Sequence, residues 1–290
     1  MELVRRYPQY VDRFRRGMDS QPFALMACNY ISNLSYASYV DIGKVGMDID
    51  YWEAGYRCMD WCCGELLELL KDKDLMKDTI IVLYGDHGDD YWGHGTHNGL
   101  AHAIEPNNLL IHTPLIIWDG IHRKEPEHDQ RLIQTSDLRE VIMVLLNGRT
   151  LESLPTRRYV ISRNEYAAQP IREESFNKAY SVTEGRYMLM VSGKGLEMYD
   201  TKMDPACQNN VLRFFVYENG ILRSNEKKME MLRFHLLNFW NSREQRILRQ
   251  KFYKLKDVLY TQTLDLYIAG NRSEKDMLDE MKFEKVNTAF

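Results

Sequence analysis

A carboxylate and an imidazole stand side by side in this chain, at Asp86 and His87, directly after the apolar residues 79–84. A short apolar run rich in β-branched residues is typical of a buried strand, so both side chains are expected at a strand end. Carboxylate oxygen and imidazole nitrogen are ligands that suit divalent cations such as zinc, manganese or calcium. The sequence therefore predicts a metal-binding edge in which Asp86 and His87 are ligands.

The stretch around this pair is rich in histidine and glycine. Five of the eight histidines lie within residues 79–118, and three of them follow the pair closely. The glycines among them let the backbone approach a ligand, because glycine has no Cβ. This composition favours the edge of an active site.

The elements that position this edge follow from the hydrophobic spacing. Apolar spacing predicts helices over residues 1–20 and 51–71. Short apolar runs predict buried strands over 22–30 and 79–86, with a loop over 33–50. A strand, a long helix and a second apolar strand favour a parallel βαβ crossover.

The later elements follow a different pattern. A third strand is expected over 109–120, with His112 inside it as a structural residue and Pro114 as an irregularity. A short helix is expected over 136–147, with Ser136 as its N-cap and Gly148 near its end. The remaining expectations are a strand over 159–166, an antiparallel meander over 179–200, and helices from Asn225 with an interruption at 269–273.

Composition excludes several classes of function. The 38 basic and 42 acidic residues give a formal net charge of −4, so nothing favours nucleic acid or an anionic membrane as a partner. No run of about 18 apolar residues is present, and the first residues lack a signal-peptide pattern. Cys58 and Cys62, one helical turn apart, are interpreted as buried thiols because no C-x-x-C zinc motif occurs. Taken at face value, these features predict a soluble cytoplasmic chain.

Four segments, in this order and spacing, resemble the sulfatase branch of the alkaline-phosphatase superfamily. They are PFALMACNYISNLSY at 22–36, the helix–strand unit that ends in GDHGDD at 90, HTPLIIWDG with TSDLREVIMVLLNG, and GRYMLM…LEMYDTKMDPACQNNVL at 185–212. The resemblance covers roughly residues 20 to 212. It implies an α/β sandwich with a mostly parallel sheet flanked by helices, incomplete at the amino end, plus a small antiparallel subdomain and terminal helices.

The resemblance also implies a division of the chain and a chemistry. The expected parts are a catalytic portion at 1–150, an antiparallel subdomain at 151–215 and a helical tail at 216–290. The implied activity is metal-dependent hydrolysis of sulfate esters, on a small molecule or a glycan. Asp86 and His87 would hold the cation, which is calcium for a sulfatase and zinc or manganese for the phosphate-ester branch.

The histidine-rich loop takes its implied role from the same resemblance. In the family, a cationic or imidazole group after the Asp-His pair contacts the ester oxygens or the leaving group. The usual lysine has no counterpart here, so His97, His94 and His102 are the candidates. An imidazole there would protonate the leaving alkoxide, and the cation would stabilise the charge that develops on the transferred group.

One departure from the family pattern concerns the nucleophile. No C-x-P-x-R or C-x-A-x-R motif surrounds any of the five cysteines, and no acidic strand precedes Pro22. We therefore expect a fragment that is inactive alone, one half of a split enzyme with a complementing amino-terminal chain, or a degenerate paralogue; a homo-oligomer also fits. The compartment would be periplasmic or extracellular if an upstream signal is missing. Two other functions stay open: a phosphodiesterase or phosphoryl transferase of the same superfamily, and a non-catalytic binding or structural protein.

Overall fold

In the computed structural model the chain forms two compact units. One consists of residues 1–81 with 117–125, the other of residues 82–116 with 126–290, and the division passes through two strands. The structure describes residues 51–91, 100–101, 105–122, 125–149, 151–154, 156–164, 178–228 and 242–287. The expected helix over 1–20, strand over 22–30 and loop over 33–50 lie outside these ranges.

The first unit is described mainly through one long helix. Helix α3 spans Tyr51–Asp72, and the short 3-10 helix η2 follows at Met76–Asp78. Its 22 residues confirm the helix expected over 51–71. Cys62 is buried, whereas Cys58 on the preceding turn is only half-buried, so the buried-thiol interpretation holds for Cys62.

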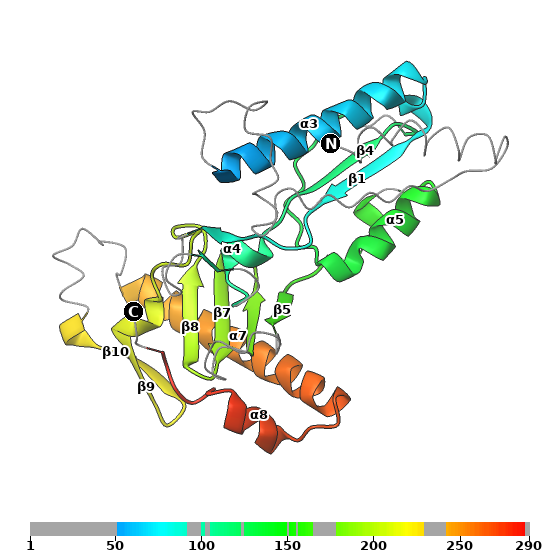
Figure 1. The fold of residues 1–290 in the computed structure, drawn as a ribbon. Helices are drawn as coiled ribbons and strands as arrows, with labels where there is room; N and C mark the ends of the chain where they lie inside the picture. The colour runs from blue at the N-terminus through cyan, green and yellow to red at the C-terminus, as the bar shows by residue number, and fades with distance from the viewer. Residues whose placement is uncertain are drawn as a thin grey trace. The chain divides into compact units, whose positions relative to one another are not determined.

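The strand that precedes the candidate metal ligands pairs with a later strand. Strand β1 covers Ile80–Tyr84 and β4 covers Leu115–Asp119 (Figure 1). The Gly85 amide donates to the Pro114 carbonyl at 3.2 Å, and the Gly120 amide donates to the Thr79 carbonyl at 3.0 Å. Because the partner number falls as the first number rises, the two strands run in opposite directions.

The described sheets therefore differ from the mostly parallel sheet that was expected. Within the described ranges the sheets are small and antiparallel, and no parallel sheet is found. The only helix among the described residues between β1 and β4 is the short α4, Asn108–Ile111, and no crossover helix there brings β4 back in the same direction. The strand expected over 22–30, the intended parallel partner, lies outside the described residues.

A helical turn replaces the first part of the strand expected over 109–120. Helix α4 spans Asn108–Ile111, and the Asn107 side-chain oxygen accepts hydrogen bonds from the amides of Leu109 and Leu110 at 3.0 and 3.2 Å. This N-cap satisfies amides that would otherwise lack partners, so the apolar residues form a turn of helix. His112 is the exposed C-cap of α4 and lies before β4, which corrects its expected place inside the strand.

A similar local correction applies to the next helix. Helix α5 spans Leu138–Leu146 and follows the 3-10 helix η3 at Thr135–Asp137; the 3-10 turn η4 lies at Leu151–Ser153. The expected cap Ser136 is inside η3, and a reciprocal capping box joins Gln134 and Asp137 instead. The carboxylate of Asp137 also forms an ion pair with Arg157. Asp137, and not Ser136, therefore makes the side-chain contacts at the start of this helical segment.

The second unit is built on a four-stranded antiparallel sheet in the order β5-β6-β7-β8. The turns contain Gly185 and Gly195 at φ +101° and +121°, values that favour glycine over other residues. These strands confirm the meander expected over 179–200 and the strand expected over 159–166. Their bounds are Val160–Asn164 for β5, Ala179–Thr183 for β6, Tyr187–Ser192 for β7 and Gly195–Asp200 for β8.

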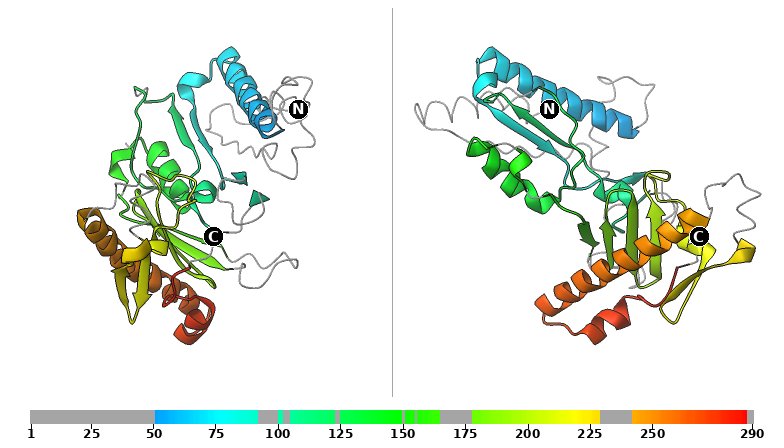
Figure 2. Two further views of the ribbon diagram at one scale, coloured as in Figure 1. Left: turned by 90° about the vertical axis from the view of Figure 1, so that its left-hand side faces the viewer. Right: turned by 180° about the vertical axis from the view of Figure 1, so that it is seen from behind.

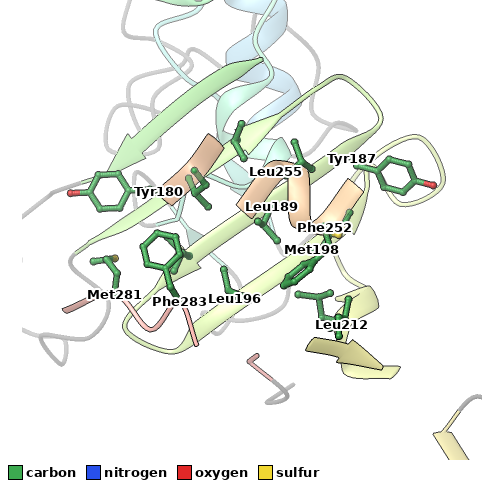
Figure 3. Close-up of a cluster of buried hydrophobic side chains, with 14 of the residues drawn as sticks. Tyr180, Tyr187, Leu189, Leu196, Met198, Leu212, Phe252, Leu255, Met281 and Phe283 are labelled. Atoms are coloured by element: carbon green, nitrogen blue, oxygen red, sulfur yellow. The ribbon is translucent and has the colours of Figure 1, made fainter. Parts of the chain in front are cut away.

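One face of this sheet is covered by a long helix. Helix α7 spans Ser242–Ala269 and contacts β6 and β7, as the opposite views of Figure 1 and Figure 2 show. Helix α8, Glu274–Glu280, follows it, so the helices expected from Asn225 with a break near 270 are confirmed within the described ranges. In those ranges no helix is both long and apolar enough to cross a membrane. The buried side chains between sheet and helices include Tyr180, Leu189, Leu196, Met198, Phe252, Leu255 and Phe283 (Figure 3).

The opposite face of the sheet is buried as well. Met188, Met190 and Tyr199 alternate along β7 and β8 with the residues that face α7, and they pack with Cys207 and with Ile111 of α4. Every residue of β7 is consequently buried. The α4 segment thus covers the face of the sheet that α7 does not.

A second hairpin was not anticipated. Strand β9, Phe215–Glu218, follows the 3-10 helix η6 at Val211–Phe214 and pairs antiparallel with β10, Ile221–Ser224. Asn219 and Gly220 between them both have positive φ, 49° and 74°. An Asn-Gly pair between short apolar runs is a strong hairpin signal, so the sequence did contain the information.

The core between the sheet and α7 should dominate the stability of the second unit. We expect Leu255→Ala, at a fully buried position of α7, to lower the free energy of unfolding by about 2–5 kcal/mol because it leaves a cavity. The same substitution at Leu278, which is 41% exposed, should cost about 0.5 kcal/mol or less. Urea unfolding followed by circular dichroism measures both, and equal midpoints for the two variants would contradict this description of the core.

Candidate metal centre

The candidate ligands follow β1 directly and are enclosed by two glycines. The Gly85 amide is bonded to Pro114, and the Gly88 amide donates to the Leu110 carbonyl at 2.8 Å. The hydroxyl of Thr113 also donates to the Gly85 carbonyl at 3.2 Å. Backbone contacts on both sides of Asp86 and His87 therefore attach this edge to the segment that contains α4.

The contact at Gly88 is closer than any other residue type allows. A Cβ placed on Gly88 would lie 2.1 Å from the Leu109 carbonyl oxygen, which belongs to the backbone of α4. Gly85 is less restricted, because a Cβ there would lie 3.1 Å from Cβ of Thr113. Glycine at 88 is thus a steric requirement for packing the strand end against α4.

The Asp-His pair has a geometry that fits a divalent cation. Nδ1 of His87 lies 2.8 Å from the Gly88 carbonyl oxygen, and because a carbonyl only accepts, Nδ1 carries the proton and Nε2 the lone pair. Nε2 lies 3.9 Å from Oδ2 of Asp86, while Oδ1 of Asp86 accepts from the His87 amide at 2.9 Å. Two ligands that each lie about 2.0–2.6 Å from one ion have a separation of this order.

The exposure of the two side chains also agrees with a ligand role. The Asp86 side chain is 82% exposed and that of His87 is 36% exposed, so a cation from solvent can reach both. A histidine that binds metal commonly donates its second ring nitrogen to a carbonyl, as Nδ1 of His87 does here. Within the described ranges no group of three or more histidine, cysteine or acidic side chains is found, so further ligands are not identified there.

The three candidate catalytic histidines are not placed by the structure. His94 and His97 lie between the two-residue strands β2, Asp90–Tyr91, and β3, Leu100–Ala101, and His102 follows β3 directly. All three are outside the described residues. Their position near Asp86 therefore stays a prediction from the sequence.

Sequence reasoning missed the polar contacts that join the α4 segment to the sheet β5–β8 within the second unit. Glu105 had no assigned role, yet it is 3% exposed, and its carboxylate lies 3.2 Å from Nζ of Lys194. The Asn108 side chain donates to the Pro205 carbonyl at 2.9 Å, which joins α4 to the DP segment of the tail. Pro106 beside Glu105 marked a turn, but no local signal indicated burial.

Comparison with known families decides the relationship of the amino-terminal part. The sulfatase family model matches residues 11–148, which include Asp86, His87 and the histidine-rich loop. Residues 11–148 are thus similar to the sulfatase family. The matched region ends before the sheet β5–β8 and the tail segment at 185–212, so the similarity lies in the part that contains the candidate metal edge. No curated protein matches the chain.

Several solved sulfatase-related structures are similar to the chain at low identity. Two come from work on the metabolism of multiple glycosaminoglycans by Bacteroides thetaiotaomicron. One has 16% identity and a TM-score of 0.46, and the match covers 69% of this chain and 45% of the other chain. The second has 14% identity and a TM-score of 0.49, and the match covers 80% of this chain and 52% of the other chain. A Pseudoalteromonas sulfatase has 14% identity and a TM-score of 0.41, covering 81% of this chain and 51% of its own. This chain thus spans about half the length of the structures it matches.

The close contact at Gly88 gives a direct test of how the edge is held. We expect Gly88→Ala to lower the free energy of unfolding by at least about 1–3 kcal/mol, because the new methyl group meets a backbone oxygen that cannot rotate away. Thermal unfolding of the purified chain measures the loss.

Gly64 of α3 provides the matched control for that substitution. A Cβ at Gly64 meets nothing within 4 Å, so Gly64→Ala should leave stability unchanged or raise it by up to about 1 kcal/mol. If Gly88→Ala proved as stable as Gly64→Ala, the packing of the strand end against α4 would be wrong.

Proposed function

We propose that this chain supplies the metal-binding side of a sulfatase-type active site that hydrolyses sulfate esters. The observation that carries the proposal is the Asp86–His87 edge within the family-matched residues. Nδ1 of His87 lies 2.8 Å from the Gly88 carbonyl oxygen, and Nε2 lies 3.9 Å from the Asp86 carboxylate. This arrangement supports the expected ligand roles of both residues.

The residues of this chain would bind a divalent cation and hold it in position. A divalent cation at this edge would stabilise negative charge that develops on the transferred group. Asp86 contributes a charged oxygen and His87 a neutral nitrogen, and the contact of Gly88 with α4 fixes the backbone between them. Calcium is the proposed cation for sulfate-ester chemistry, since the exposed carboxylate is a hard oxygen ligand.

The histidine-rich loop would act on the leaving group. A protonated imidazole can donate a proton to an alkoxide near neutral pH. The proposed donors are His97, His94 and His102. The number of imidazoles favours a second candidate, hydrolysis or transfer of phosphate esters, because imidazole suits zinc or manganese better than calcium. Metal preference therefore distinguishes the two chemistries.

The nucleophile is the part of the reaction that the printed sequence does not explain. None of the five cysteines lies in a C-x-P-x-R or C-x-A-x-R motif. We propose that the covalent step requires a nucleophile supplied outside these 290 residues, for instance by a complementing polypeptide. The proposed substrates are small-molecule or glycan sulfate esters.

Metal binding tests the proposed edge without requiring turnover. We expect the purified chain to bind Ca²⁺, and Asp86→Asn and His87→Ala each to weaken binding by at least about tenfold, because each removes a direct ligand. Isothermal titration calorimetry with Ca²⁺, Mn²⁺ and Zn²⁺ measures the affinities. Tighter binding of Zn²⁺ or Mn²⁺ than of Ca²⁺ would favour the phosphate-ester chemistry.

His128→Ala is the matched control, because His128 is an exposed histidine in a polar loop. It should bind each metal as the unmodified chain does. If all three variants bound Ca²⁺ with unchanged affinity, the edge would not be a metal site and the proposal would lose its main support.

Turnover addresses the proposed origin of the nucleophile. The purified chain alone should hydrolyse neither 4-nitrophenyl sulfate nor 4-nitrophenyl phosphate above the rate of His87→Ala, because none of its five cysteines lies in a sulfatase nucleophile motif and the covalent step would need a nucleophile from elsewhere. Release of 4-nitrophenol measures the rate. Turnover by the unmodified chain that disappears in His87→Ala would place the nucleophile inside these residues and contradict this part of the proposal.

A further inference from the structure

Helix α4 is too short to keep its conformation by itself. It consists of one turn, Asn108–Ile111, and forming a single turn fixes several backbone angles for few hydrogen bonds. The Asn107 cap satisfies the amides of Leu109 and Leu110, but a cap does not fix the place of a turn on the protein. Contacts with other elements must therefore hold α4 in position.

Two side chains of α4 provide such contacts. Nδ2 of Asn108, the first residue of the turn, donates to the Pro205 carbonyl at 2.9 Å. The side chain of Ile111, the last residue, packs against a buried cluster that spans β7, β8 and the segment after β8. The members of this cluster are Met188, Met190, Tyr199 and Cys207. A polar contact at one end of α4 and an apolar contact at the other thus attach the turn to the carboxyl-terminal sheet.

The segment that accepts the polar contact has an ordered backbone. The Asp204 carboxylate accepts hydrogen bonds from the amides of Gln208 and Asn209 at 3.1 and 2.7 Å. The Asp204 amide itself donates to the carbonyl of Asp200, the last residue of β8, at 2.8 Å. These bonds close a turn around Pro205 and join it to β8. The Pro205 carbonyl is therefore a firm point of attachment.

The backbone of the same helical turn holds the end of the metal edge. The Leu110 carbonyl accepts from the Gly88 amide at 2.8 Å, and the Leu109 carbonyl oxygen occupies the space that a Cβ on Gly88 would need. The Gly88 carbonyl oxygen in turn lies 2.8 Å from Nδ1 of His87. A shift of α4 would therefore move Gly88 and, with it, the carbonyl that orients the His87 ring.

We propose that Asn108 and Ile111 are positioning residues for the candidate metal edge, so that its affinity for a divalent cation depends on the carboxyl-terminal sheet. Neither residue is a proposed ligand. Both act through α4, which holds Gly88, and Gly88 orients the ring of His87. The effect on cation binding rests on the proposed function, whereas the mechanical link between α4 and Gly88 does not.

Preorganisation gives this link its consequence for binding. A ligand that is already held in its binding orientation loses less conformational freedom when the cation arrives, so the cation binds more tightly. The His87 ring has to present Nε2 on the side of the Asp86 carboxylate, which lies 3.9 Å away. Loss of the contact at Asn108 or Ile111 should therefore weaken cation binding although no ligand is removed.

The first measurement is hydrogen exchange of the Gly88 amide without added metal. Asn108→Ala removes the donor to Pro205, and Ile111→Ala removes most of the apolar contact. Each should make exchange at Gly88 about threefold to tenfold faster, because a lost contact of this size favours local opening. The amide of Leu189, in the buried strand β7, should exchange as before, which separates opening of α4 from a general loss of stability.

Two further variants serve as controls. Ile111→Val keeps most of the apolar contact and should stay close to the unmodified chain. Nδ2 of Asn147 also donates to a backbone carbonyl, that of Met143 at 2.7 Å, but both residues belong to the α5 region, so Asn147→Ala should leave Gly88 unchanged. Exchange at Gly88 that is no faster in Asn108→Ala and Ile111→Ala than in Asn147→Ala would overturn the proposal.

Cation binding is the second measurement, by isothermal titration calorimetry with Ca²⁺. Asn108→Ala and Ile111→Ala should each bind about threefold to tenfold more weakly than the unmodified chain, and the two controls should bind as it does. Unchanged affinity in both alanine variants would overturn the positioning role. If the unmodified chain bound none of Ca²⁺, Mn²⁺ and Zn²⁺, the proposed function would fail instead, and exchange at Gly88 would still decide whether α4 holds this edge.

Discussion

The approach of Gly88 to the backbone of α4 is the constraint on which the described site depends. A side chain at position 88 would occupy the space of the Leu109 carbonyl, so the strand end and the helical turn can pack only with glycine there. The hydrogen bonds from Gly85 and Gly88 to Pro114 and Leu110 make the same connection on both sides of the Asp-His pair. Backbone contacts therefore position the candidate metal edge, Asp86 and His87.

The α4 segment carries that constraint into the carboxyl-terminal sheet. Ile111 packs with the apolar side chains on one face of β7 and β8, and Asn108 bonds the DP segment of the tail. Glu105 is connected to the same sheet by its ion pair with Lys194, in the turn between β7 and β8. Segments that the sequence analysis treated as separate anchors, the strand end and the MYDTKMDP tail, thus belong to one packed region. A change in the carboxyl-terminal subdomain would accordingly be felt at the metal edge.

Elements with a clear local pattern were predicted well. Periodic apolar spacing identified α3, the charge-laced helical sequence after Asn225 identified the region of α7, and turn glycines identified the β6–β7–β8 meander. Helix and hairpin formation depend on neighbours in sequence, so such patterns are informative. The prediction failed at α4, where the Asn107 cap turned apolar residues into a helix. No parallel sheet is found among the described residues, and the strand expected to supply the parallel partner, at 22–30, lies outside them. The Asn219-Gly220 hairpin was missed although its signal was present.

The sequence by itself was enough to find the similarity of residues 11–148 to the sulfatase family and to propose Asp86 and His87 as metal ligands, because both rest on local patterns of residue types. Only the tertiary structure decided that Glu105 is buried beside Lys194. Burial is a property of the surroundings, and here those surroundings include the β7–β8 turn. A glutamate before a proline has the same local sequence whether it faces water or a lysine from a distant turn. The fold alone makes that difference.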